Sequence, residues 1–250
     1  MTSLIREAYH IFQRDGLREL VYKGPRFLYR KMRMFLPPSS HVRYNGVAID
    51  KRRRFGDKIA PLDPDELDDE PGYKSSSAAM IRGYIQEDDH VIVIGGGWGV
   101  TAVIAAKSIG DSGNVIVYEP SNIRYGRTKA ACKLNHMRGS ISVKHAFVGP
   151  LGTIDEGEVK APQVSPAALP EHDVLQLDCE GAEAAIVSEL ENKPRMIIVE
   201  THGFRGTSTA ETKQALRAQN YNVKHQLPLD VGIDYSKKKD AFLLVALLNY

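Results

Sequence analysis

The stretch that decides the fold is "VIVIGGGWGV", residues 91–100, in which four branched apolar residues run directly into three glycines, a tryptophan and a fourth glycine. The apolar run predicts a buried strand, and the glycines predict a tight turn into a helix. A turn of this composition lets a ligand approach the backbone closely. A bare turn without a ligand is the alternative, but three alternating glycines plus Gly96 are more than such a turn requires.

Strands and helices alternate from residue 75 to the end of the chain, and this pattern predicts a parallel sheet covered on both faces. The predicted strands are residues 91–94, 114–118, 142–148, 173–178, 195–201, 221–225 and 241–248, with a short extra strand around 153–160. The predicted helices are residues 76–86, 99–108, 121–134, 182–190 and 208–219. No helix is predicted between the last two long strands, so we expect them to form an antiparallel edge.

The segment before this region has a different character. Short helices are predicted in residues 1–36, a hairpin turning at Asn45 and Gly46, and a linker over residues 51–72. Residues 1–60 hold 14 Lys and Arg against 5 Asp and Glu, within a chain whose net charge is only +2. We therefore expect two domains, a basic helical extension over residues 1–72 and an α/β domain over residues 73–250. The basic extension is either a solvated face or a surface that meets an anionic partner.

The composition fits a protein of the cytoplasm. The chain has 250 residues, of which 42% are hydrophobic and 26% charged, and no apolar run approaches the roughly 20 residues that cross a bilayer. The N-terminus lacks the pattern of a secretory signal. Cys132 and Cys179 form neither a disulfide framework nor a metal-binding motif, which favours a reducing compartment.

The spacing of the glycines favours one class of cofactor. A dinucleotide-binding turn usually has the spacing Gly-x-Gly-x-x-Gly, and here Val100 occupies the position three after Gly97. The alternate spacing of Gly95, Gly97 and Gly99 resembles the first motif of class I S-adenosylmethionine (SAM) methyltransferases. Glu119 ends the next strand, where its carboxylate can accept two hydrogen bonds from a ribose diol. An NAD dehydrogenase would share that carboxylate, but the glycine spacing disfavours it.

Three further stretches carry a specific resemblance. "DVLQLDCEGAEAAIVSEL" at residues 173–190, together with "VYEP" and "IIVETHG", resembles the FkbM-type methyltransferase family, which methylates hydroxyls of sugars and macrolides. The shared pattern is an apolar strand followed by Asp-x-Glu-Gly-x-Glu, then a strand ending in Glu-x-His. The residues that match it are Asp178, Glu180, Gly181, Glu183, Glu200 and His202. The resemblance covers residues 75–205 and implies a seven-stranded, mostly parallel, Rossmann-like methyltransferase sheet.

The chain departs from the family pattern in its first strand. Val93 stands where the family usually has an acid that helps to hold the amino-acid end of the cofactor, and Gly96 and Gly97 replace a small residue plus Asn. Gln176 stands where lysine is frequent. These departures leave open a second hypothesis, a catalytically degenerate domain that binds a ligand or a partner subunit without catalysis.

The leading hypothesis is a SAM-dependent O-methyltransferase acting on a glycan hydroxyl, with a uronic acid carboxyl as a variant that the resemblance brings in. Methylating an alcohol requires positioning and removal of a proton. Asp178 is assigned to positioning, and His202 or Glu180 to the role of base. We expect Asp178, Glu180, Glu200 and His202 to converge at the carboxyl edge of the sheet. Their ligand atoms would also suit Mg²⁺ or Mn²⁺, and the presence of a metal stays open.

Three residues have a structural and a functional interpretation. Trp98 either stacks on the cofactor or covers the first helix, and we include it with Gly95, Gly97, Gly99, Glu119 and Asp178 in the predicted cofactor site. Glu183 is predicted to cap the helix that it opens, because a carboxylate there suits the helix dipole. His202 is either a base or an inert loop residue.

Two partners are predicted and one is argued against. The acceptor is a sugar or a lipid-linked glycan, and residues 1–36 could rest on an anionic membrane face where such glycans are assembled. Nucleic acid is disfavoured, because amino-methylating enzymes usually carry an Asn/Asp-Pro-Pro-aromatic turn where this chain has "DCEGAE".

Overall fold

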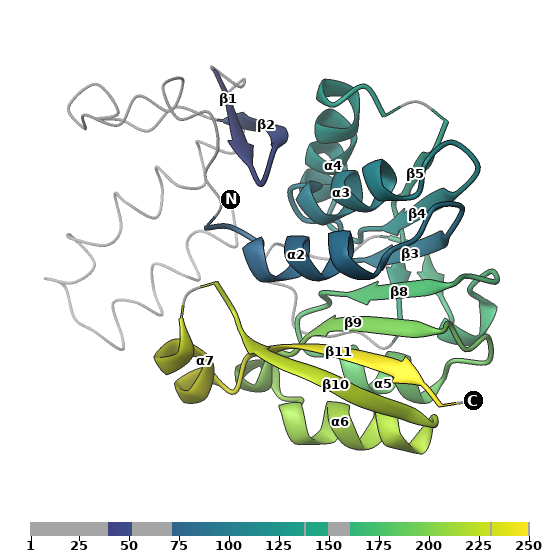
Figure 1. Ribbon diagram of the computed structural model, residues 1–250, viewed down its shortest axis with the longest axis vertical. Helices are drawn as coiled ribbons and strands as arrows, with labels where there is room; N and C mark the ends of the chain where they lie inside the picture. The colour runs from purple at the N-terminus through teal and green to yellow at the C-terminus, as the bar shows by residue number, and fades with distance from the viewer. Residues whose placement is uncertain (1–39, 52–71, 138, 150–160, 231, 250) are drawn as a thin grey trace, which may run out of the picture. The chain divides into compact units, whose positions relative to one another are not determined.

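The computed structural model describes residues 40–51, 72–137, 139–149, 161–230 and 232–249 (Figure 1). The helices predicted in residues 1–36, nearly all of the linker predicted over residues 51–72 and the strand predicted around 153–160 lie outside the described residues. The chain divides into two compact units, and the larger one contains residues 42–49 and 68–250. The predicted domain boundary at residue 72 stays a prediction.

Seven strands of the described residues form one sheet, as predicted (Figure 1). In spatial order they are β10 (Tyr221–Pro228), β11 (Phe242–Leu248), β9 (Met196–Glu200), β8 (Val174–Leu177), β3 (His90–Ile94), β4 (Asn114–Tyr118) and β5 (Ile141–Lys144). The five strands from β9 to β5 are parallel neighbours, and β11 pairs antiparallel with both β9 and β10. The predicted antiparallel edge is therefore confirmed. The reversed strand is β11, and it lies between β9 and β10, which run in the same direction as the rest of the sheet.

Helices cover both faces of the sheet, and each face has its own hydrophobic cluster. On one face lie α2 (Ser75–Tyr84), α3 (Val100–Ser108) and α4 (Asn122–Leu134); on the other lie α5 (Glu183–Ser188) and α6 (Thr209–Ala218). The sequence of α3 is predominantly apolar, and residues 100–106 are all buried, as expected for a helix enclosed by its neighbours. The predicted doubly wound α/β architecture is confirmed.

The predicted hairpin is also confirmed. Strands β1 (Ser40–Tyr44) and β2 (Val47–Lys51) are joined at Asn45 and Gly46, whose φ angles are 51° and 78°. Positive φ at both central residues defines the tight hairpin turn that Asn-Gly favours. Val42, Val47 and Ile49 belong to the hydrophobic cluster on the α2 face, so this hairpin shares the core of the α/β unit.

Two connections differ from the prediction. The strand predicted over residues 142–148 is interrupted: β5 ends at Lys144, and β6 (Phe147–Val148) pairs instead with β7 (Gln163–Val164). A short helix, α7 (Ile233–Lys239), lies between β10 and β11, where no helix was predicted. Its sequence carries three consecutive lysines and buries only Ser236, so it has no apolar stripe that the sequence pattern could reveal.

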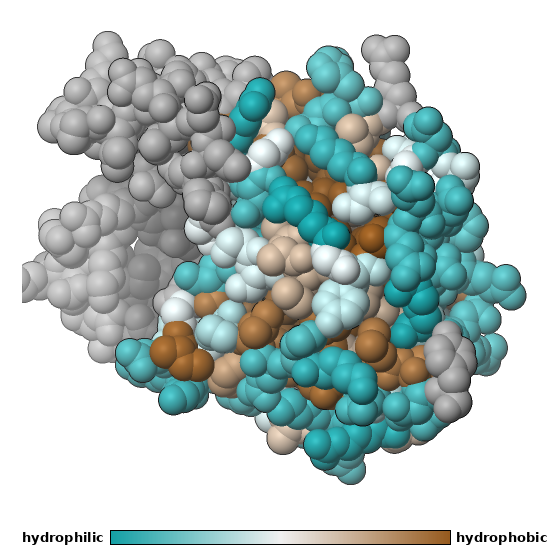
Figure 2. Space-filling model, viewed as in Figure 1, coloured by the Kyte–Doolittle hydropathy of each residue, from teal (hydrophilic) through white to brown (hydrophobic). Residues whose placement is uncertain are grey.

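The surface of the described residues is mostly polar on the face seen in Figure 2. Hydrophobic atoms are nevertheless visible over α7 (Figure 2), where Ile233 and Tyr235 are exposed. Among the described residues, no helix combines the length and the apolar character needed to span a bilayer.

Candidate active site

The carboxyl ends of β8 and β9 bring two acids together on one face of the sheet. Side chains alternate between the two faces of a strand, so Asp178 follows Val174 and Gln176 on the α2 face, and Glu200 follows Met196 and Ile198 on that same face. Because the strands are parallel neighbours, both carboxylates arrive at one edge. This is the convergence that the sequence predicted.

The ammonium of Lys74 lies between these two carboxylates. Its Nζ atom is 2.8 Å from Oδ2 of Asp178 and 2.5 Å from Oε2 of Glu200. Lys74 directly precedes α2. The first turn of that helix contains Ser77, whose hydroxyl donates to Oε1 of Glu200 at 2.6 Å. The start of α2 therefore forms the wall of the site opposite the sheet.

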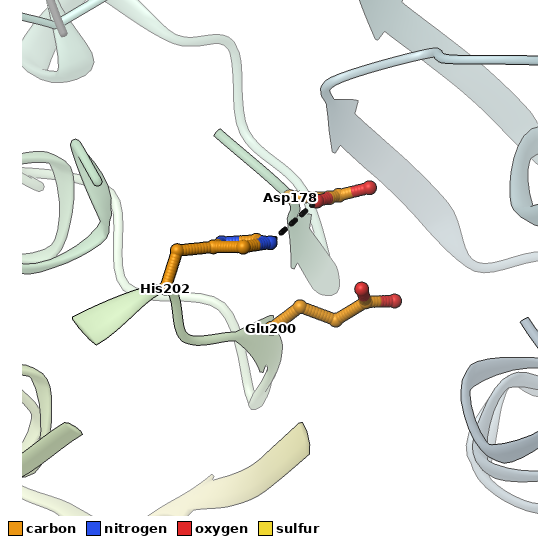
Figure 3. A group of neighbouring side chains, drawn as sticks. All are labelled: Asp178, Glu200 and His202. Carbon is orange, nitrogen blue, oxygen red and sulfur yellow. Dashed lines mark ion pairs between the residues drawn. The ribbon is translucent and has the colours of Figure 1, made fainter. Parts of the chain in front are cut away.

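His202 completes the cluster from the loop after β9. Its Nε2 atom lies 3.5 Å from Oδ1 of Asp178 (Figure 3). Its Nδ1 atom lies 2.7 Å from Oε1 of Glu183. Glu183 is fully buried, and Ala182 occupies the cap position of α5 without a side-chain hydrogen bond. Glu183 does lie in the first turn of α5, where a carboxylate suits the helix dipole, but its carboxylate contacts His202 and the cap position is held by Ala182.

Burial and charge set the protonation states of the cluster. Burial pulls the pKa of His202 down, but the hydrogen bond to Glu183 and the charge of Asp178 outweigh it and raise the pKa to about 9. Burial likewise opposes the charge on Lys74, yet Asp178 and Glu200 raise its pKa well above the usual value. Burial favours the neutral form of Asp178, but Lys74 and His202 lower its pKa. At neutral pH the cluster therefore holds an imidazolium, an ammonium and ionised Asp178.

Burial dominates for Glu200, whose pKa is raised even though Lys74 pulls it down. Asp178 adds to the rise because it is a like charge nearby. Of the two acids that bracket Lys74, Glu200 is therefore the more easily protonated.

Glu119 lies at the end of β4 and is bonded to the glycine turn. Its Oε2 accepts from the amide of Gly97 at 2.9 Å, and its Oε1 accepts from the amide of Ser121 at 2.9 Å. The residue is 2% exposed, and burial raises its pKa despite these two donors. A carboxylate has about four lone-pair sites, so two remain for a ligand after both amides are satisfied.

The glycines of the turn make room chiefly for other parts of the chain. A Cβ atom on Gly95 would lie 2.0 Å from the carbonyl oxygen of Asp178, and one on Gly99 would lie 2.9 Å from Cβ of Ala131. Gly95 also has a φ of 95°. Sequence analysis assigned the missing side chains to a ligand; the structure assigns the tightest approaches to the β8 loop and to helix α4.

A pocket opens beside this turn. Its walls are apolar at Ile94, Pro120, Phe147 and Val148, and carboxylates stand at Glu119, Asp178 and Glu180, with Gly95, Arg124 and Cys179 completing the lining. Of the predicted cofactor residues, Gly95, Glu119 and Asp178 line the pocket. Gly97, Trp98 and Gly99 are not among its lining residues.

Trp98 shows the packing interpretation, and Glu180 stands apart from the other acids of the predicted cluster. The guanidinium of Arg127 lies 4.1 Å from the ring centroid of Trp98, and the ring packs against the α2-face core. This is the packing alternative for Trp98. Glu180 lines the pocket but forms an ion pair with Arg205 at 3.2 Å, so its carboxylate is not grouped with Asp178, Glu200 and His202.

Val93 and Gln176 are both buried in the sheet. Val93 has no exposed surface and belongs to the α2-face core, where it pairs in register with Gln176. Oε1 of Gln176 is buried without a hydrogen-bond partner among the described residues. The position where the family usually has an acid is thus filled by packing.

Sequence analysis missed Lys74 and Ser77. Lys74 lies 21 residues before Gly95, directly after the charged segment read as a linker, and no motif marks it. A cation just before a helix that begins "SSS" is an unusual choice, since the N-terminal end of a helix disfavours positive charge. That local inconsistency was the available signal.

Comparison with known proteins supports the fold by structure alone. Neither a protein-family model nor a curated protein gives a sequence match. A Streptococcus mutans structure described as a SAM-dependent methyltransferase aligns with a TM-score of 0.52 and 10% identity over 85% of this chain, which spans 56% of that protein. A SAM-dependent methyltransferase of Aquifex aeolicus aligns with 14% identity over 79% of this chain and 100% of its own, at a TM-score of 0.47.

A third structure, the Aeropyrum pernix fibrillarin with natively bound SAM, aligns with 14% identity over 85% of this chain and 100% of its own, at a TM-score of 0.46. At 10% identity the likeness to the Streptococcus mutans structure, at a TM-score of 0.52, extends to the fold alone. Together with the seven-stranded sheet, it gives this chain a Rossmann-like, methyltransferase-type fold.

Proposed function

We propose that this protein is a SAM-dependent O-methyltransferase that acts on a hydroxyl of a glycan, with a uronic acid carboxyl as the variant acceptor. The observation that carries the proposal is the His202–Glu183 pair beside Asp178, placed next to a pocket that combines apolar walls with Glu119. The fold class, the pocket and this histidine–carboxylate pair support methyl transfer to oxygen.

The residues of the pocket fit the cofactor. The buried carboxylate of Glu119 keeps two lone-pair sites for a ribose diol. Phe147, Val148 and Pro120 offer the apolar surface that an adenine ring requires. Gly95 lines the same pocket. When bound, the cofactor supplies a methyl group on a positively charged sulfur.

His202 is suited to accept the proton of the acceptor. Glu183 holds Nδ1 of the ring, so in the neutral imidazole the proton stays on Nδ1 and the lone pair lies on Nε2. That atom faces Asp178, which lines the pocket. An alcohol oxygen that takes the methyl group gives its proton to Nε2, and the neighbouring Asp178 carboxylate stabilises the imidazolium that results.

An exposed aromatic ring next to the cluster supports a sugar acceptor. Phe204 is 42% exposed, and its ring centroid lies 5.9 Å from that of His202 in an edge-to-face arrangement. The C–H face of a pyranose ring is apolar and packs onto such a ring, while its hydroxyls reach polar groups at the edge. The resemblance carried by Asp178, Glu180, Glu183, Glu200 and His202 points to the same acceptor class.

The experiment is transfer of isotopically labelled methyl from SAM to lipid-linked glycans, followed by mass spectrometry. We expect a mass increase of one methylene per transferred group, lost in His202→Asn. Phe204→Ala serves as the second variant, expected to weaken acceptor use while retaining transfer at high acceptor concentration. Transfer to RNA or to a tetrapyrrole, with none to any glycan, would contradict the acceptor class.

A degenerate binding domain is the second candidate, and Val93 is the observation that favours it. Because Val93 is enclosed in the core, it cannot supply the acid that usually helps to hold the cofactor. Such a domain would bind SAM weakly or not at all, and a calorimetric titration separates the two candidates.

The membrane contact predicted for residues 1–36 is a separate proposal. Its support is the excess of basic residues in that part of the sequence. Sedimentation with vesicles containing anionic lipid, comparing the full chain with a chain lacking residues 1–36, tests it. Equal binding by both forms would remove the idea.

A further inference from the structure

The group formed by Asp178, Glu200 and His202 has the composition of a divalent-cation site. One ligand atom from each residue lies within 4.8 Å of the others. Two carboxylates and one imidazole are ligand types that Mg²⁺ and Mn²⁺ accept. A cation is nevertheless already in place, because the ammonium of Lys74 contacts both carboxylates.

All four carboxylate oxygens of this group have partners on the chain. In Asp178, Oδ2 contacts Lys74 and Oδ1 faces His202; in Glu200, Oε2 contacts Lys74 and Oε1 accepts from Ser77. A metal ion entering the group would therefore have to displace the ammonium. The ammonium of Lys74 therefore competes with a metal ion for the two carboxylates.

Lys74 occupies its position against several local costs. Its φ of 60° is left-handed, a conformation that is unfavourable for a residue other than glycine. It stands at the cap position of α2 without a side-chain cap, where the helix dipole disfavours a positive charge. Its side chain is only 16% exposed. The contacts that offset these costs are the two carboxylates, and strain of this kind gathers at functional sites.

We propose that Lys74 is an internal cation that takes the place of a divalent metal in this site, holding Asp178 and Glu200 in position beside the acceptor. Its role in methyl transfer rests on the proposed function: Lys74 acts as a positioning residue, and transfer proceeds without added metal. Its role as the competitor for metal does not rest on that function. Removing the ammonium leaves Asp178, Glu200 and His202 as a vacant set of three ligands.

The test is Mn²⁺ binding to the full chain without cofactor, measured by the electron paramagnetic resonance signal of free Mn²⁺ and by calorimetry. We expect Lys74→Ala to bind one Mn²⁺ at least about tenfold more tightly than the wild type. The double variant Lys74→Ala, Asp178→Asn should lose that gain. Lys224→Ala, which removes an exposed lysine on β10, is the matched control and should behave as the wild type.

Two results would overturn the proposal. One is that the wild type binds Mn²⁺ tightly, with the same affinity as Lys74→Ala. The other is that both proteins bind Mn²⁺ weakly, although circular dichroism shows that Lys74→Ala is folded. If the alanine variant does not fold, Lys74→Met keeps the apolar stem without the charge, and the same two results apply. Whichever variant is used, tight binding of Mn²⁺ by the wild type would alone contradict the proposal. Because none of these measurements uses SAM, they hold whether or not methyl transfer is found. Where transfer is found, it should survive a chelator.

Discussion

The Nδ1 atom of His202 lies 2.7 Å from the Oε1 atom of Glu183, a residue with no exposed surface. This contact joins the loop after β9 to the first turn of α5. It fixes the ring orientation and directs Nε2 toward Asp178, so the neutral form of the ring, which increases as the pH rises toward about 9, has Nε2 as its one proton-accepting nitrogen.

The pH dependence of the reaction should follow His202. Its pKa is raised to about 9, so the neutral form needed to accept a proton increases as the pH rises toward that value. For a hydroxyl acceptor, kcat/KM should therefore increase from pH 7 and level off above about pH 9, because this ratio reports the free enzyme. A carboxylate acceptor carries no proton, and its profile should lack this rise. A hydroxyl acceptor with a flat profile would argue against His202 as the base.

Glu183→Gln should move that profile. The amide can still bond the ring, but it no longer carries the charge that favours the imidazolium, so the pKa of His202 should fall. The rise in kcat/KM should shift to lower pH, and the maximal rate should fall because the tautomer is less strictly held. Direct titration of the His202 ring by NMR gives the same pKa independently. An unchanged pKa would contradict the role of Glu183.

Glu119→Ala should weaken cofactor binding. The substitution removes the carboxylate that faces the pocket and also the acceptor of the Gly97 and Ser121 amides. A hydrogen bond to a charged group is worth about 1.5–3 kcal/mol, so the Kd for SAM should increase about tenfold to a hundredfold. Calorimetry measures it, and Glu211→Ala, an exposed capping residue of α6, should leave the Kd unchanged.

Gly95→Ala should destabilise the fold. Its Cβ would lie 2.0 Å from the carbonyl oxygen of Asp178, and the φ of 95° is unfavourable for alanine. We expect the free energy of unfolding to fall by at least about 2 kcal/mol, measured with urea. Gly126→Ala is the matched control within α4, where a Cβ meets no atom within 4 Å. That variant should be neutral or slightly stabilising, since alanine favours helix over glycine.

Phe204→Ala tests the acceptor surface. The ring is exposed and contacts His202 only edge to face, so its loss should increase KM for a glycan about threefold to tenfold with little change in kcat. A fall in kcat at constant KM would place Phe204 in the support of His202 instead of in acceptor binding.

The architecture could be predicted because its signals are local and periodic. The apolar strands, the helices between them and the Asn45–Gly46 turn each follow from short-range pattern. Helix α7 could not, since a short, lysine-rich helix that buries little resembles a loop. At the site, the positions of the strand ends indicated that Glu119, Asp178 and Glu200 would lie together, because the carboxyl ends of parallel strands meet at one edge of the sheet.

The rest of the site depended on contacts that sequence distance conceals. Lys74 reaches Asp178 across 104 positions of the chain, and only the packing of α2 against the sheet brings them together. For Glu183 the sequence allowed two favourable roles, near the helix dipole or inside the site, and the partner that decided between them was His202. The cation–π contact between Trp98 and Arg127 likewise could not be predicted from the spacing of residues in the sequence.

The central claim is that the pocket lined by Gly95, Glu119 and Asp178 accepts the adenosyl sulfonium donor. Calorimetric titration of the purified full-length chain with SAM measures this most directly. The account predicts one saturable site per chain, weakened in Glu119→Ala. Heat no different from dilution at millimolar ligand, from protein whose fold is intact by circular dichroism, would contradict it.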